Sequence, residues 1–390
     1  MQKRVLAGVV LLAVLLALIF AFYPGNSQEI NLSTGAGISK MLRYENAQVY
    51  FFGETHRCTE YQQFRNALFQ YLVKEKGVRV LVEESGYATA FLENETVQGR
   101  LSFSDWLDRC TLSKEDYELY SWIADWNSGR DAAEKISIIG IDITDDVGNI
   151  QTFCQYLLKN HDFTGADTQT QWLLTAIREQ NPFSSLQLQT FQEKFLPQLA
   201  ELYQTKPKQL ETVLGTQTVY LERALLGWEE AQEQQRLKGE TEQLGGPGDV
   251  YRESCLYENF MWEYQQKPDA KYYGQFGGAH VLMSDYSGKL YRVQNSFVTR
   301  LAETDTPLNG KLTVIDGCLT FEIGDLGGTG TNRATLYRTA CARPPVRDRN
   351  KFYTDGSAPD AGYAQYVLLF EHPDALTAAK EYTGSYWKYH

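Results

Sequence analysis

Two histidines that lie far apart in the sequence each end a Gly-x-x-His segment. His56 follows the apolar run 49–52, and His280 follows the run 272–276. An imidazole can take a proton from water near neutral pH, or it can bind a metal ion through a ring nitrogen. Since both histidines stand in the same strand-end context, we take them as candidate catalytic or metal-binding residues.

Carboxylates end three apolar runs of the same kind. Glu54 stands just before His56, Glu84 ends the run 80–84, and Asp142 ends the run 138–142. Such runs are typical of buried strands, and ligand sites collect at the carboxyl edge of a parallel sheet. We therefore expect His56, His280 and these carboxylates to meet at one edge.

Glu84 should lie on the same face of its strand as Val82, where an unpaired carboxylate is costly. Its expected partner is Arg65, on the helix before that strand, either as a structural salt bridge or as a catalytic pair. Glu83 points to the opposite face and is expected to be structural. Asp142 either caps the next helix or orients a histidine, and we favour the second role.

Strands that alternate with helices predict an α/β fold with a largely parallel central sheet flanked by helices. Strands are expected at about 47–53, 78–84 and 136–143, with a fourth before His280, and helices at about 60–76, 87–97 and 250–265. A long helical insertion at about 148–245 separates the third strand from the fourth. Further strand-like runs occupy 311–315, 318–323 and 364–370, and 325–360 is expected to be an ordered loop.

The first residues differ from the rest of the chain. Lys3 and Arg4 precede an unbroken apolar run from Val5 to Phe22. A run of this length is at the lower limit for a membrane span. We favour a signal anchor at 1–27 over a cleaved signal peptide. The anchor predicts a single-pass protein of the cell membrane with residues 28–390 outside the cytoplasm, whereas the signal peptide predicts secretion.

Composition and motifs exclude several classes of function. The net charge of -12 at pH 7 argues against nucleic-acid binding. The six cysteines fit an oxidising compartment and include no Cys-x-x-Cys pair that would indicate a structural zinc cluster. No Gly-x-Ser-x-Gly elbow, phosphate loop or dinucleotide fingerprint at a strand end occurs. Attack by water is therefore favoured over a covalent serine intermediate.

The order of the motifs resembles the erythromycin esterase family over about residues 45–300. The segments that carry the resemblance are Gly53-Glu54-Thr55-His56, Leu81-Val82-Glu83-Glu84-Ser85-Gly86, Gly140-Ile141-Asp142, Arg252-Glu253-x-x-Leu256 and Gly278-Ala279-His280. The resemblance implies that Glu54, His56, Arg65, Glu84 and His280 occupy active-site positions. It implies that His56 is the general base that activates water, and it adds Arg252 to the supporting residues.

Two departures from the family pattern point to the wider superfamily, which includes the Tiki and TraB proteins and the haem-binding ChaN group. Only Thr55 separates Glu54 from His56, and Gly277 replaces the first histidine of the last motif. Likeness to the Tiki branch implies a divalent metal, such as zinc, manganese or cobalt, held by His56, His280 and Glu54.

The leading expectation is a membrane-anchored, extracytoplasmic hydrolase that cleaves an ester, lactone or amide of a small molecule or peptide. The water is activated by His56 or by a metal ion. One alternative is a Tiki-type or TraB-type metal-dependent peptidase. The other is a ChaN-type protein that binds haem or another ligand through His56 or His280 without turnover.

Overall fold

A computed structural model gives the structure of the chain. It describes residues 27–56, 58–143, 145–181, 184–239, 245–287, 292–293, 295–317, 333–338 and 364–370.

The centre of the protein is an eight-stranded sheet in the order β1-β9-β10-β8-β2-β5-β3-β4. Six neighbouring strands are parallel: β10 (Tyr366–Phe370), β8 (Leu312–Asp316), β2 (Val49–Glu54), β5 (Tyr272–Gly277), β3 (Val80–Gly86) and β4 (Ser137–Asp142). β9 (Arg333–Arg338) and β1 (Ser27–Asn31) extend the β10 side in antiparallel fashion, and β6 (Tyr286–Ser287) pairs with β7 (Arg292–Val293). The predicted α/β class with a largely parallel sheet is confirmed.

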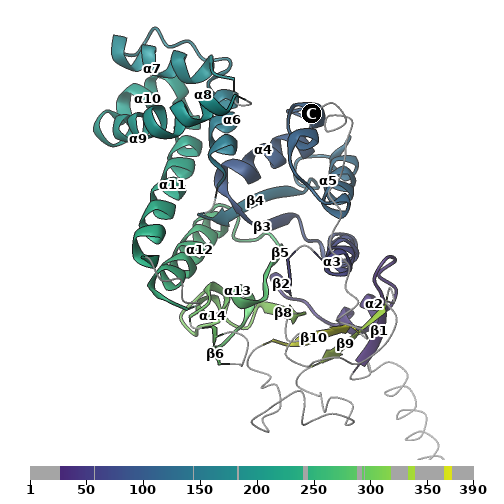
Figure 1. The fold of residues 1–390 in the computed structure, drawn as a ribbon. Coiled ribbons are helices and arrows are strands. Elements are labelled where there is room, and N and C mark those ends of the chain that lie inside the picture. Colours follow the sequence, from purple (N-terminus) through teal and green to yellow (C-terminus); the bar gives the residue numbers. More distant parts are fainter. Residues whose placement is uncertain are drawn as a thin grey trace, which may run out of the picture.

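Helices cover both faces of this sheet (Figure 1). One face packs against α2 (Ile38–Leu42), α3 (Thr59–Tyr71), α4 (Tyr87–Val97) and α5 (Lys114–Asn127), and the other against α12 (Pro247–Gln266), α13 (Gly278–Val281) and α14 (Phe297–Leu301). Alternation along β2 divides its side chains between the layers. Phe52 packs on Phe64 of α3, whereas Phe51 packs on Phe260 of α12 and Phe297 of α14.

Between β4 and β5 the described residues are mostly helical. The helices are α6 (Val147–Leu158), α7 (Thr168–Arg178), α8 (Ser185–Thr190), α9 (Leu196–Thr205), α10 (Pro207–Leu214) and α11 (Thr218–Lys238), followed by α12. Figure 1 shows α7 to α10 gathered away from the sheet and α11 leading back to α12 beside it. Short π or 3-10 turns occupy Leu72–Lys76, Phe103–Asp105, Leu107–Arg109, Phe191–Phe195 and Gly215–Gln217.

The expectation of a loop over 325–360 is wrong for β9. Ala334 and Leu336 are buried in this strand. They alternate with polar or aromatic residues, which is the period of a strand with one buried face. The Gly, Thr, Arg and Pro content of the surrounding segment concealed this short alternation. The strand expected at 318–323 lies outside the described residues.

The predicted single-pass location in the cell membrane is corrected. Among the described residues, no helix is both long enough and apolar enough to span a bilayer. The run Val5–Phe22, on which the signal anchor or signal peptide was predicted, lies outside those residues. The membrane location is not carried further.

Candidate active site

The carboxyl ends of β2, β5, β3 and β4 lie side by side and carry the predicted site residues. Glu54 pairs in register with Gly277 at the ends of β2 and β5, and Glu84 lies near the end of β3 beside them. The chain continues from β2 to His56 and from β5 into α13, which contains His280. The structure therefore brings both histidines to one edge of one sheet.

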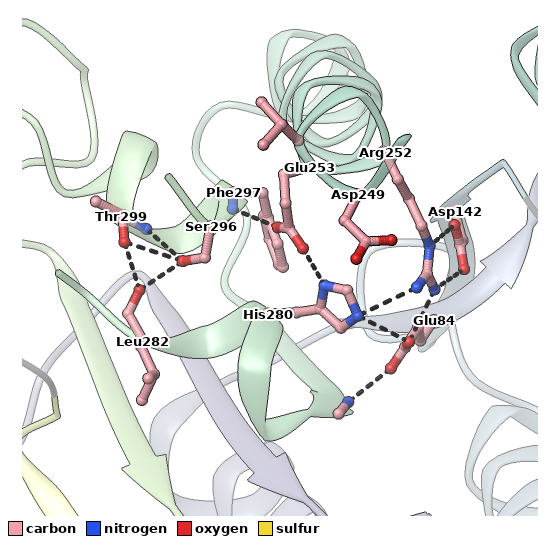
Figure 2. A network of polar contacts seen from close by, with 12 residues as sticks. Glu84, Asp142, Asp249, Arg252, Glu253, His280, Leu282, Ser296, Phe297 and Thr299 are labelled. Carbon is pink, nitrogen blue, oxygen red and sulfur yellow. Dashed lines mark hydrogen bonds and ion pairs between the residues drawn. The ribbon is translucent and has the colours of Figure 1, made fainter. Parts of the chain in front are cut away.

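His280, whose side chain is 13% exposed, lies between two carboxylates (Figure 2). Its Nδ1 bonds to Glu253 Oε1, and its Nε2 lies 3.3 Å from Glu84 Oε1. Glu253 is itself held by the backbone N–H of Phe297, which donates to Oε2 at 2.7 Å. Burial lowers the pKa of His280, but Glu253 and Glu84 outweigh it and raise that pKa to about 10. His280 is therefore an imidazolium at neutral pH.

Glu84 joins the two halves of the site. Its Oε2 accepts a hydrogen bond of 2.6 Å from the N–H of Gly277, and its Oε1 lies 2.9 Å from Arg252 Nη2. Burial acts to raise the pKa of Glu84. His280, His56 and Arg252 outweigh burial and hold the pKa well below its usual range. Glu84 is therefore ionised at neutral pH, and His280, His56 and Arg252 all face its carboxylate.

Arg252, rather than Arg65, is the cationic partner of Glu84, which corrects the expected pairing. Arg252 projects from α12 on the face where Glu84 points, and it also bonds to both oxygens of Asp142. Arg65 belongs to α3 on the opposite face, where its Nη1 lies 2.5 Å from Asp116 Oδ1. Strand alternation separates the two arginines, because Glu83 and Glu84 point to different layers.

Asp142 and Glu83 also have defined partners. Asp142 holds Arg252, whose Nη1 lies 3.3 Å from His280 Nε2. The cap of α6 is instead Asp146. Glu83 accepts a hydrogen bond of 2.9 Å from the Tyr120 hydroxyl on the α5 side, as its predicted direction requires.

His56 is the accessible member of the site. Its side chain is 57% exposed, its Nδ1 lies 3.0 Å from Glu54 Oε1, and its Nε2 lies 3.6 Å from Glu84 Oε2. The hydrogen bond that His56 donates to Glu54 raises the pKa of His56 most, although burial acts against it. Burial raises the pKa of the Glu54 carboxyl, and the bond to His56 acts against that shift. With Nδ1–H donated to Glu54, the neutral ring has a basic Nε2.

Gly277 leaves room for this imidazole. A Cβ at position 277 would lie 2.9 Å from His56 Nε2 and 3.5 Å from His280 Cδ2. The first distance is shorter than side-chain packing allows. The glycine that replaces a histidine of the esterase pattern therefore permits the two imidazoles to flank one backbone position.

Glu253 is the site residue that sequence reasoning did not select. A glutamate at the start of a helix has a simple explanation in the helix dipole, and the helix was expected to begin near residue 250. α12 begins instead at Pro247, which places Glu253 in its second turn, beyond the range of that effect. Proline is typical of the first position of a helix, and Pro247 was the signal that could have identified Glu253 as a residue of the second turn.

The described residues do not fit a bound metal ion well. The guanidinium of Arg252 lies beside the Nε2 of His280, the ring nitrogen that its bond to Glu253 leaves for a metal ion. Within the described ranges, no group of three or more His, Cys, Asp or Glu side chains could hold a metal ion. We derive no step through a metal or haem, and both remain predictions from sequence.

The structure defines an α/β fold of the erythromycin esterase type with a polar site at the carboxyl edge of its sheet. A histidine-to-asparagine mutant of the erythromycin esterase EreC, in its open conformation, has a TM-score of 0.59 at 13% identity, over 91% of this chain and 98% of that one. A Bacillus cereus protein has a TM-score of 0.55 at 15% identity, over 91% and 97%.

A succinoglycan biosynthesis protein has a TM-score of 0.52 at 17% identity, over 77% of this chain and 74% of that one. No family model matches the chain, and a search of the curated proteins finds no sequence match. At these identities the likeness concerns the fold.

Proposed function

We propose that the protein is a hydrolase that adds water to a carboxylic ester or lactone of a small molecule. The observation that carries the proposal is the accessible His56, whose Nδ1 is bonded to buried Glu54 while its Nε2 faces the site. A histidine oriented by a carboxylate is a general base. The fold of an erythromycin esterase supports ester or lactone cleavage over peptide cleavage.

In the proposed reaction, Nε2 of neutral His56 takes a proton from water as the water oxygen attacks the carbonyl carbon. The carbonyl electron pair moves to its oxygen and forms a tetrahedral oxyanion. When that pair returns, the bond to the leaving oxygen breaks, and the imidazolium of His56 gives its proton to the leaving alkoxide. Water is thus divided between an acid and an alcohol, and His56 is regenerated.

Two fixed cations contact Glu84, the carboxylate that His56 also faces. Arg252 and protonated His280 are anchored by Asp142 and Glu253, so they do not need to reorganise when negative charge develops on the substrate. We assign to Arg252 and His280 the electrostatic stabilisation of the oxyanion. Glu84 positions all three basic groups through its two oxygens.

The experiment is a hydrolysis panel in water enriched in heavy oxygen, with aryl and alkyl esters, simple lactones, erythromycin, and short peptides. We expect turnover of an ester or lactone, with the heavy oxygen found in the acid product by mass spectrometry. Cleavage of peptides alone would contradict the proposal, and so would turnover of no ester or lactone in the panel. Metal analysis of the same preparation reports whether a divalent ion accompanies the activity.

A further inference from the structure

A cavity of about 840 Å³ lies beside β4, the strand at one edge of the sheet. Neither His56 nor His280 is among the residues that line it. Its walls come from β4, α4, the end of α6, the start of α11 and the end of α12. Figure 1 shows α12 and α4 beside β4, with α11 next to α12. Glu263 lines the cavity and lies about 16 Å along α12 from Arg252, given the helix rise per residue.

The size and the walls of the cavity suit a bound small molecule. Ligand sites in proteins commonly have volumes of roughly 300–1,000 Å³ and apolar walls with a few polar groups. Beside its polar residues, the lining contains five half-buried aromatic side chains: Tyr87, Phe91, Tyr156, Tyr220 and Trp262. Phe91 contacts two of the other rings: its ring centroid lies 5.3 Å from that of Tyr220 and 6.0 Å from that of Tyr156.

Three polar groups of the lining have no hydrogen-bond partner in the part of the chain that the structure describes. They are the hydroxyls of Tyr87 and Tyr220 and the carboxylate of Glu263. Burial raises the pKa of Glu263 to about 7, while Lys267 and Arg223 act against that shift. A polar group withdrawn from water is stabilised by a partner. The cavity therefore presents both acceptors and donors that a ligand can satisfy.

The charges of the lining nearly balance. Glu95 pairs with Arg100 and also accepts a hydrogen bond of 2.7 Å from the Tyr156 hydroxyl. Glu263 lies near Lys267, and Lys159 adds one positive charge to the lining. A cavity for a phosphate or for a multiply charged amine would carry a larger excess of one sign. This lining instead matches a neutral ligand with many hydroxyl groups.

We propose that the cavity binds a neutral oligosaccharide. A sugar ring has an apolar C–H face that packs on an aromatic ring, and its hydroxyls donate and accept hydrogen bonds around the rim. Trp262 and Tyr220 supply such rings, and Glu263 and Tyr87 supply the partners of the hydroxyls. Arg223 lies over the Trp262 ring, with its guanidinium carbon 4.7 Å from the ring centre.

The test is a titration of the full chain with maltotriose, cellotriose and N-acetylchitotriose, followed by tryptophan fluorescence and by saturation-transfer NMR. We expect one of these sugars to bind with a Kd in the millimolar range or below. Trp262→Ala and Glu263→Gln should each weaken that binding about tenfold or more. Glu258→Gln, an exposed position on the same helix, is the matched control and should bind as the parent does.

Circular dichroism and the melting temperature verify that each variant is folded, and Glu263→Gln keeps the shape of its side chain if Trp262→Ala does not fold. The proposal is overturned if none of the three sugars binds, if the variants bind as tightly as the control, or if inorganic phosphate or citrate displaces the sugar. None of these measurements requires hydrolysis. The cavity proposal and the proposed hydrolase function can therefore fail separately.

Discussion

Replacing His56 by alanine should lower kcat/KM of the hydrolytic reaction by roughly 100- to 10,000-fold, the range that a general base contributes. The protein should remain folded, because the His56 side chain is largely exposed. We expect the free energy of unfolding to change by less than about 1 kcal/mol. The measurements are initial rates on the best ester or lactone of the panel and urea unfolding of the same preparation.

The matched control is His161→Ala. His161 also has a side-chain hydrogen bond, to Gln217 Oε1, but it lines the cavity beside β4 and not the carboxyl edge of the sheet that carries His56. This variant should keep parental kcat/KM. Parental turnover by His56→Ala would show that another group activates the water, and equal losses in both variants would indicate an effect of folding.

Replacing Arg252 by leucine should lower the free energy of unfolding by about 3–5 kcal/mol, the cost of removing one partner from a buried ion pair. The substitution leaves Asp142, which is 1% exposed, and Glu84 as neighbouring carboxylates without their shared cation. Burial then penalises both charges. Urea denaturation at neutral pH measures the loss, and an unchanged m value confirms that the unfolding reaction is the same.

Arg236→Leu is the control for this prediction. Arg236 pairs with Glu233 on the surface, where the two side chains are 69% and 38% exposed, so the change should leave the free energy of unfolding close to that of the parent. Adding Asp142→Asn to Arg252→Leu should recover part of the loss, since one stranded charge is removed. Equal losses from the two arginine variants would contradict the buried network.

Local patterns in the sequence were sufficient for the parallel strands of the sheet and for the meeting of His56, His280 and Glu84, but they did not predict β1 or β9. Each of these three residues stands at the end of an apolar run, and parallel strands bring such ends to one edge. The same patterns indicate that Glu83 and Glu84 face different layers, because side chains alternate along a strand.

The partners of these residues were not predictable in the same way. Whether Arg65 or Arg252 meets Glu84 depends on which helix crosses which face of the sheet, and that is set by the path of the chain through helices α6 to α12. The role of Glu253 depends on where α12 begins and on the approach of Phe297 from α14. Both are long-range features of packing that leave no periodic signal in the sequence.

The central claim is that neutral His56, oriented by Glu54, activates the water. The most direct test is the pH dependence of kcat/KM in the parent and in Glu54→Gln. Only the neutral ring accepts a proton, so activity should rise with pH through the pKa of His56, which the bond to Glu54 raises. Glu54→Gln replaces the carboxylate beside His56 by a neutral amide, so the rise in kcat/KM should move to lower pH. The value of kcat/KM on the plateau should also fall. A rise that stays at the same pH in Glu54→Gln would contradict the account.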